Sequence, residues 1–111
     1  MKHAILSIDQ GTTSTRSIIF NENGNLVKSF QKESNLFFPK NGWVEHNPKE
    51  IILQTIQTAK SAISNIKNKV DAIGITNQRE TTLIWEKKTG NPIGNAIGWE
   101  DIRTSEYCTY L

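Results

Sequence analysis

The chain has 111 residues, of which 36% are hydrophobic and 22% are charged, and its formal net charge is +2. These values are typical of a globular domain and exclude a collagen-like, low-complexity or fully disordered chain. The charges are spread without a long basic run, which argues against nucleic acid or an anionic membrane as the main partner. A single cysteine, Cys108, excludes an intramolecular disulfide, so we expect a reducing, cytoplasmic location.

Three strands are expected in the first third of the chain. Residues 4–8 form an apolar run that ends at a carboxylate, and the run is too short for a signal peptide or a membrane span. We therefore expect no membrane insertion. Residues 16–20 and 26–33 follow as further strands, and the Asn23-Gly24 pair between them is typical of a hairpin turn. The three strands are expected to be antiparallel.

One long helix is predicted to begin at Pro48 and to end near Asn68. Asn47 supplies the N-cap, proline suits the first helical position, and Glu50 lies three residues after the cap. Apolar residues then recur at spacings of three and four, so we expect this face to pack on a sheet. The residues of this face are Ile52, Ile56, Ala59, Ile63 and Ile66.

A further strand is expected after the helix. Residues 35–46, before the helix, contain proline, glycine and three aromatic residues and are expected to be irregular. Residues 70–75 form an apolar run typical of a central strand, and a polar turn follows at residues 76–80. The order β-β-β-α-β indicates an α/β domain with its site at the sheet edge where the two polar turns leave the strands.

The last third of the chain has weaker patterns. Residues 82–85 are expected to form a strand, and residues 93–99 an extended stretch. A turn centred on Thr89-Gly90 separates them, and a helix is expected from about Glu100.

The turn between Asp9 and Arg16 contains the residue types that a phosphate requires. Six consecutive polar or glycyl residues, four of them hydroxylic, offer N–H and O–H donors, and Arg16 adds a cation at the exit. Asp9 ends the preceding strand, where a carboxylate can hold Mg²⁺ directly or through a water. A Thr-rich hairpin turn is the alternative interpretation. Neither GxxxxGK[ST] nor GxGxxG occurs, which excludes P-loop and Rossmann sites.

A second candidate site follows residues 70–75. Arg79 brings five donors and Glu80 only acceptors, so together they suit adjacent hydroxyls, as on a polyol. A solvated surface pair is the alternative. The apolar face of Trp99 suits a carbon backbone, although tryptophan is more often packed in a core. His3 and His46 lack Cys or acidic partners at ligand spacing, so we expect no transition-metal site.

Four ordered blocks resemble the amino-terminal region of the FGGY carbohydrate kinases. They are DQGTTSTR at residues 9–16, GWVEHNP at 42–48, IGITNQRET at 73–81 and NAI at 95–97. The similarity runs from about Ala4 to the chain end. Within the family, the TNQRET part of the third block is similar to the members that phosphorylate glycerol rather than to those that act on sugars.

The resemblance implies an α/β fold of the actin-like, ribonuclease-H-like ATPase type, which this chain would contain only in part. Residues 1–111 would be the amino-terminal part of the family's N-terminal domain, without the second domain. The implied reaction is ATP-dependent phosphorylation of glycerol to glycerol 3-phosphate, with Mg²⁺ as cofactor, in a cytoplasmic enzyme that is a homo-oligomer at full length. The alternatives are a kinase for another polyol or sugar of the family and a non-catalytic actin-like phosphate-binding module.

The resemblance also implies roles for residues on the phosphate side. Thr12, Thr13 and Ser14 would contact the nucleotide phosphates. Arg16 would pair with those phosphates, and Asp9 would serve the magnesium.

On the acceptor side, Arg79 and Glu80 would bind glycerol hydroxyls, and Trp99 would line the glycerol pocket. The sequence departs from the family pattern at Glu100 and Ile102, where the family usually has Gln and often Arg. No catalytic residue is expected within this chain, because the resemblance implies that the base lies beyond its last residue. The fragment alone is therefore expected to be inactive.

Overall fold

The computed structural model describes residues 1–67 and 70–111. They form two compact units, each of which is described by itself. Unit 1 comprises Met1–Ser34 and Glu50–Gln78, and unit 2 comprises Asn35–Lys49 and Arg79–Leu111. No helix among the described residues has the length and apolar character needed to cross a membrane.

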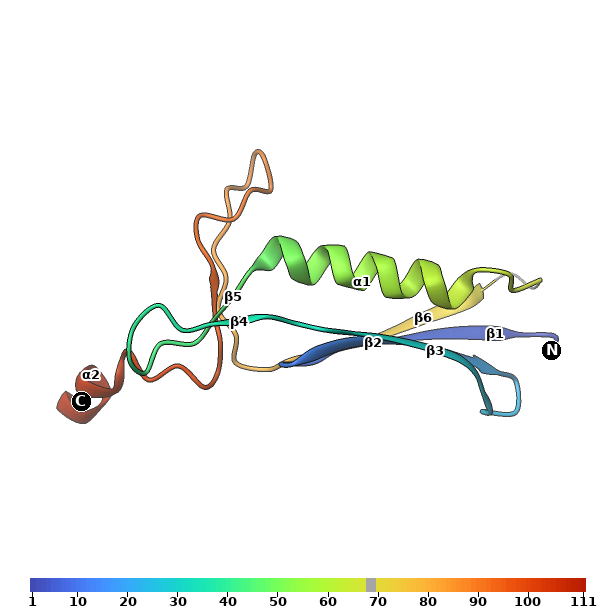
Figure 1. The fold of residues 1–111 in the computed structure, drawn as a ribbon, viewed down its shortest axis with the longest axis horizontal. Helices are drawn as coiled ribbons and strands as arrows, with labels where there is room; N and C mark the ends of the chain where they lie inside the picture. Colours follow the sequence, from blue (N-terminus) through green and yellow to red (C-terminus); the bar gives the residue numbers. More distant parts are fainter. Residues whose placement is uncertain (68–69) are drawn as a thin grey trace. The chain divides into compact units, whose positions relative to one another are not determined.

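Unit 1 is built on a four-stranded sheet (Figure 1). Its strands are β1 (Ala4–Gln10), β2 (Ser14–Asn21), β3 (Leu26–Glu33) and β6 (Val70–Asn77), in the spatial order β3-β2-β1-β6. The first three are antiparallel neighbours, and β6 pairs with β1 in parallel. The predicted order β-β-β-α-β is confirmed. Within the described chain, however, β6 is an edge strand and not the predicted central one.

The helix α1 (Pro48–Ile63) begins where its capping signals predict. Asn47 Oδ1 accepts a backbone N–H of the first turn at 3.0 Å. The helix ends before the predicted end at Asn68, which lies outside the described residues. Lys28 Nζ, on β3, donates to the Ser64 carbonyl oxygen at 2.6 Å, so a cation partners the carbonyls just after the helix.

The face of α1 that packs on the sheet differs from the prediction. Gln54, Thr58 and Ala62 are buried, and Thr58 Oγ1 forms a buried 2.9 Å hydrogen bond with Ser17 Oγ on β2. Small and hydrogen-bonding side chains thus lie against the sheet. Among the predicted residues, Ala59 and Ile66 do pack against the core. The exposed ones are Ile52 (62% exposed), Ile56 (46%) and Ile63 (41%).

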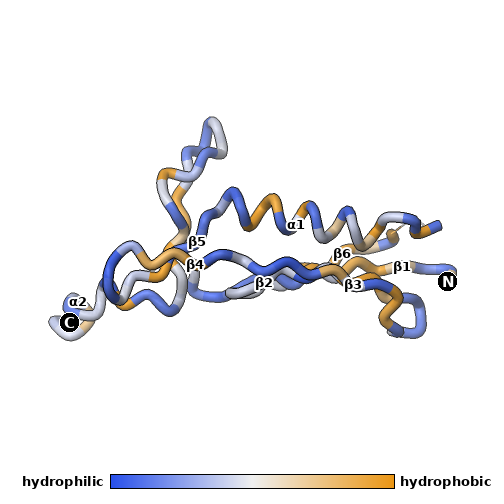
Figure 2. The backbone as a smooth tube through the Cα atoms, in the orientation of Figure 1, coloured by the Kyte–Doolittle hydropathy of each residue, from blue (hydrophilic) through white to orange (hydrophobic). Residues whose placement is uncertain are grey.

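The core of unit 1 lies between α1 and one face of the sheet. Its members are Ala4, Leu6, Ile8, Ile19 and Ala62. Figure 2 shows apolar segments alternating with polar ones along α1. Because side chains alternate along a strand, Asp9 on β1 and Arg16 on β2 lie on the face of the sheet opposite to the core residues Ile8 and Ile19. Both are exposed.

Unit 2 contains a small antiparallel sheet in the order β4-β5-β7. The strands are β4 (Leu36–Phe37), β5 (Glu45–His46) and β7 (Ala96–Ile97). The first two lie in the segment that was predicted to be irregular. The predicted extended stretch at residues 93–99 contains only the two residues of β7.

The predicted strand at residues 82–85 is wrong, since two isolated bridges replace it. One bridge joins Thr82 to Ile97 and the other joins Trp85 to Pro92. The predicted turn between these segments is confirmed, because Gly90 has a φ of 73° and donates its N–H to the Glu86 carbonyl oxygen at 2.8 Å. The helix α2 (Ser105–Tyr110) begins later than predicted.

Candidate functional site

The two polar turns leave the sheet of unit 1 at the same end. In the parallel pair of β1 and β6, Asp9 lies opposite Thr76 and Gln10 opposite Asn77. Just after β6, the Gln78 N–H donates to the Gln10 carbonyl oxygen at 2.7 Å. The predicted position of the turns, at the carboxyl ends of neighbouring strands, is therefore confirmed.

The first turn is closed by its own backbone. The Gly11 N–H donates to the Ser14 carbonyl oxygen at 2.8 Å. A Cβ atom at Gly11 would lie 3.1 Å from that same oxygen, which is closer than an ordinary contact. The side chain of Gln10 is buried and its Nε2 donates to the Gly11 carbonyl oxygen at 2.9 Å. Thr12 and Thr13 lie at the bend of this turn, between residues whose positions are fixed.

The turn is also held by α1 through β3. The Thr13 carbonyl oxygen accepts the Ser34 N–H at 2.8 Å, and Ser34 Oγ donates to Gln54 Oε1 at 3.0 Å. Gln54, only 8% exposed, donates in turn to the Glu33 carbonyl oxygen at 2.8 Å and to Glu50 Oε1 at 3.0 Å. Gln54 was not predicted from the sequence, since a glutamine in a helix is usually solvated. Its spacing of four residues from Glu50 was the available signal.

Asp9 and Arg16 lie directly opposite each other on β1 and β2. They do not form an ion pair, because Arg16 Nε and Nη2 both donate to Gln31 Oε1, at 2.9 and 2.6 Å. Within residues 1–67 and 70–111, the Asp9 carboxylate has no hydrogen-bond partner, so both of its oxygens are open to a ligand. A hard cation such as Mg²⁺ takes one or two carboxylates and completes its shell with phosphate oxygens and water. Asp9 fits that role.

The described residues contain no group of three or more His, Cys, Asp or Glu side chains that could hold a metal ion by themselves. His3 does have one acidic contact, which the sequence did not predict, because its Nδ1 lies 3.2 Å from Asp71 Oδ2. A metal at Asp9 would therefore depend on ligands from a bound nucleotide and water.

In unit 2, Glu80 has an unusual backbone. Its φ is 55°, in the left-handed region that side chains other than glycine, asparagine and aspartate rarely adopt. Such strain costs of the order of 1–3 kcal/mol and is concentrated at functional sites. Arg79 and Glu80 are both exposed, and in the described chain they form no ion pair with each other. Both side chains are solvated, as the alternative interpretation also predicts, but they are not paired with each other.

The bridge between Thr82 and Ile97 joins the segments that carry Glu80 and Trp99. Thr82 and Ile97 exchange two backbone hydrogen bonds, both of 2.9 Å. Because this bridge is antiparallel, Glu80 and Trp99 each lie two residues from it and at the same end. Trp99 is 55% exposed, so it is not the core residue that the alternative interpretation assumed.

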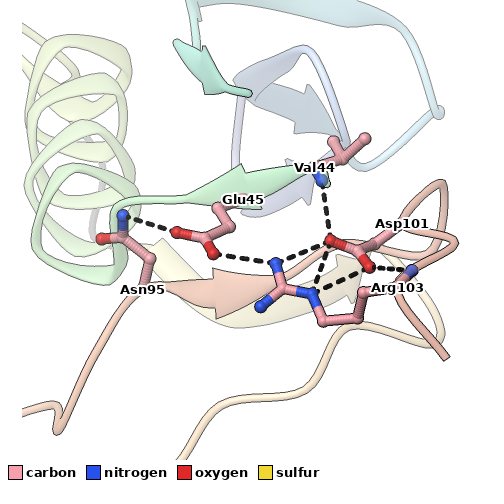
Figure 3. Close-up of polar contacts among 5 residues, drawn as sticks. All are labelled: Val44, Glu45, Asn95, Asp101 and Arg103. Atoms are coloured by element: carbon pink, nitrogen blue, oxygen red, sulfur yellow. Dashed lines mark hydrogen bonds and ion pairs between the residues drawn. The ribbon is translucent and has the colours of Figure 1, made fainter. Parts of the chain in front are cut away.

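An ion-paired group of three side chains lies beside this part of unit 2 (Figure 3). We call it the Arg103 cluster, and its members are Glu45, Asp101 and Arg103. Arg103 Nη2 lies 2.7 Å from Asp101 Oδ2 and 2.8 Å from Glu45 Oε2. The hydrogen bonds from Arg103 hold the pKa of Asp101 at about 2, below its usual value of 3.8, and also lower the pKa of Glu45. The sequence did not indicate this cluster, since its members are far apart along the chain.

The lowered pKa of Asp101 predicts a pH-dependent contribution to stability. Since the folded pKa lies below the unfolded one, the contribution is complete above a pH of about 4 and is lost as the pH falls towards about 2. We expect the difference in the free energy of unfolding between the wild type and Asp101→Asn to be constant near neutral pH and to shrink in that acidic range. Urea unfolding at a series of pH values measures it, and a difference that stays constant into the acidic range would contradict the prediction.

Comparison with known proteins shows the family to which this chain is similar. The model for the N-terminal domain of the FGGY family of carbohydrate kinases matches residues 4–111. Over 113 residues the chain is 54% identical to a glycerol kinase of Malacoplasma penetrans, covering 99% of this chain and 22% of that protein. The chain thus spans less than a quarter of the length of this relative.

Two solved structures are similar to the chain. The Plasmodium falciparum glycerol kinase with ADP has a TM-score of 0.93 and 39% identity, over 98% of this chain and 22% of that one. The ligand-bound xylulose kinase of Lactobacillus acidophilus has a TM-score of 0.92 and 25% identity, over 97% and 22%. The predicted actin-like, ribonuclease-H-like α/β fold is therefore confirmed.

Proposed function

Because the chain belongs to the FGGY family of carbohydrate kinases, we propose that it is the amino-terminal part of an ATP-dependent glycerol kinase. The product would be glycerol 3-phosphate. The 54% identity to a glycerol kinase supports glycerol over a sugar as the acceptor, since the similar xylulose kinase is only 25% identical. The observation that supports the proposal is the strained Arg79-Glu80 turn, in which Glu80, like the exposed Trp99, lies two residues from the Thr82–Ile97 bridge.

Unit 1 would provide the phosphate side of the reaction. The proposed nucleotide-binding residues are Thr12, Thr13, Ser14 and Arg16. In support, the turn that carries the three hydroxyls is closed by its own backbone and tied to β3, so its donors need little reorganisation on binding. Asp9 would hold Mg²⁺, which neutralises charge on the phosphate oxygens during phosphoryl transfer.

Unit 2 would provide the acceptor side. Arg79 would donate to glycerol hydroxyls and Glu80 would accept from them, so the pair would orient the hydroxyl that attacks the phosphate. Trp99, with half of its surface exposed, would cover the carbon backbone. Binding and orientation are the main contributions that a kinase makes to phosphoryl transfer, so no covalent step on these residues is needed.

We expect this chain alone not to phosphorylate glycerol, even with saturating ATP and Mg²⁺. Three acids that could replace the base are engaged elsewhere, because Glu45 and Asp101 pair with Arg103, and Asp71 accepts the Ala4 N–H at 3.0 Å. The base that accepts the proton of the attacking hydroxyl would come from another part of the protein. An assay for glycerol 3-phosphate with the purified 111-residue chain measures this. Product formation that Asp9→Ala abolishes would place a sufficient base within these residues.

The full-length protein should prefer glycerol to other acceptors of the family. We expect its kcat/KM for glycerol to exceed those for xylulose and gluconate at the same ATP and Mg²⁺ concentrations. A higher kcat/KM for xylulose or gluconate would favour another kinase of the family. Absence of turnover with all three, together with retained ATP binding, would favour a non-catalytic actin-like module.

The proposal includes a cytoplasmic location and a homo-oligomeric full-length protein. The location is supported by Cys108, the one cysteine of the chain, which is exposed and free. Light scattering of the purified full-length protein would determine the number of subunits.

A further inference from the structure

The turn that contains Trp99 is fixed by the backbone of a single residue on the neighbouring segment. The Val44 carbonyl oxygen accepts the Gly98 N–H at 2.9 Å, and the Val44 N–H donates to Asp101 Oδ2 at 2.7 Å. The Asp101 N–H also donates to the Gly98 carbonyl oxygen at 3.1 Å, which closes the turn. Trp99 therefore lies between two residues that are both anchored to Val44.

Asp101 holds its position because Arg103 surrounds it with donors (Figure 3). Arg103 Nε lies 2.9 and 3.0 Å from the two carboxylate oxygens, and the Arg103 backbone N–H donates to Oδ1 at 2.8 Å. The side chain of Asp101 is only 2% exposed, and that of Arg103 is 19% exposed. Together with the Val44 N–H, these donors occupy both carboxylate oxygens.

Arg103 is itself fixed on two further sides. Its Nη2 donates to Glu45 Oε2 at 2.8 Å, and its Cζ lies 3.8 Å from the centre of the Trp43 ring. Glu45 belongs to β5, lies opposite Ile97 of β7 and accepts a hydrogen bond from Asn95 Nδ2 at 3.2 Å. The cluster thus joins the residues before and after β7 to one guanidinium group.

We propose that Asp101 and Arg103 are positioning residues that fix Trp99 and thereby shape the acceptor side of the site. The inference rests on the proposed function, because that function gives Trp99 its place in the glycerol pocket. Asp101 uses both oxygens within the protein and is almost completely buried, so it acts through the turn and not by touching the substrate. An exposed indole on a fixed turn loses less conformational entropy when glycerol binds than one on a mobile turn.

Steady-state kinetics of the full-length protein test the proposal. We expect Asp101→Ala to raise the KM for glycerol by about 10-fold while the KM for ATP changes by less than about twofold, because a displaced pocket wall affects only the acceptor. Asp101→Asn should have a smaller effect, since its amide oxygen still accepts the Val44 N–H. Arg103→Lys, which cannot form the forked contact, should also raise the KM for glycerol. Glu86→Ala, which removes an exposed carboxylate in the same unit, is the matched control and should leave both KM values unchanged.

Fluorine NMR reports on the turn directly. In protein labelled with 5-fluorotryptophan, the resonance of Trp99 is the one that is missing in Trp99→Phe. We expect this resonance to shift or broaden in Asp101→Ala and Asp101→Asn, while the resonance of Trp85 stays unchanged as an internal reference. An unchanged Trp99 resonance would overturn the proposal, as would equal rises in the KM values for glycerol and ATP.

The Trp99→Ala variant distinguishes a failure of the positioning proposal from a failure of the proposed role of Trp99 in the acceptor site. If Trp99→Ala raises the KM for glycerol and neither Asp101 variant nor Arg103→Lys does, the positioning proposal is wrong and the proposed function stands. If Trp99→Ala leaves that KM unchanged, the role of Trp99 in the acceptor site is wrong, and the positioning proposal falls with it, while the Arg79→Ala variant tests the rest of that site. Should Asp101→Ala fail to fold, the milder Asp101→Asn and Arg103→Lys variants decide the matter by the same criteria.

Discussion

Replacing Asp9 with Asn in the full-length protein is expected to lower kcat by about 100-fold or more, which corresponds to about 2.7 kcal/mol. The carboxylate lies at the carboxyl end of β1, is exposed, and does not pair with Arg16 across the strand. An amide of the same shape carries no charge and is a poor ligand for Mg²⁺. Raising the Mg²⁺ concentration should restore part of the activity, and an assay of kcat against Mg²⁺ concentration measures both effects.

Asp71→Asn is the matched control for this substitution. Asp71 is also an exposed aspartate of the same sheet, but it lies at the start of β6, where it contacts His3 and accepts the Ala4 N–H. We expect Asp71→Asn to leave kcat and its dependence on Mg²⁺ unchanged. If both variants lose activity equally, the loss reflects the sheet as a whole, and the metal role of Asp9 is wrong.

Replacing Arg79 with Ala should affect the acceptor and not the nucleotide. A charged donor to a substrate hydroxyl contributes about 1.5–3 kcal/mol, so kcat/KM for glycerol should fall by about 10- to 150-fold. We expect the KM for glycerol to rise and the affinity for ATP to change little. Initial rates measured over a matrix of glycerol and ATP concentrations give both constants.

A conservative variant and a control variant accompany the Arg79→Ala test. Arg79→Lys keeps the charge but not the forked geometry, so we expect a partial loss. Lys88→Ala removes an exposed cation from the hairpin turn of the same unit and should have no effect. An unchanged KM for glycerol in Arg79→Ala would show that Arg79 is an ordinary exposed side chain that does not bind glycerol.

The elements of unit 1 could be predicted because local signals decide them. The apolar run at residues 4–8 predicted β1, and the Asn47 cap with Pro48 predicted the start of α1. The buried face of α1 could not be predicted in the same way. Periodicity shows that Ile52 and Ile56 share a face, but Gln54 and Thr58 have the same spacing of four residues. The partners on β2 and β3 decide which of these faces meets the sheet.

Unit 2 was harder to predict because its structure depends on distant contacts. The strands β4, β5 and β7 have two residues each, which is too few to carry a pattern. Their pairing joins residues near 36, 46 and 96, so no local window contains the information. The same holds for the partners of Arg103, one of which lies 58 residues away along the chain.

The residue types of the candidate site could be predicted from the sequence, but the residues that hold them in place could not. The polar turns after β1 and β6 indicated phosphate and polyol chemistry by their donors and acceptors alone. The contacts that hold them, such as Gln54 with Ser34 and Asp101 with Val44, involve side chains that look like ordinary surface residues in the sequence. Supporting residues of this kind become visible only when the fold shows that they are buried.

The most direct test of the account is a crystal structure of the full-length protein with ADP, Mg²⁺ and glycerol bound. We expect nucleotide phosphate oxygens within hydrogen-bond distance of the turn at residues 12–14, the metal beside the Asp9 carboxylate, and glycerol hydroxyls on Arg79 and Glu80. Glycerol bound away from Arg79 and Glu80, or nucleotide phosphates bound away from the turn after β1, would contradict it.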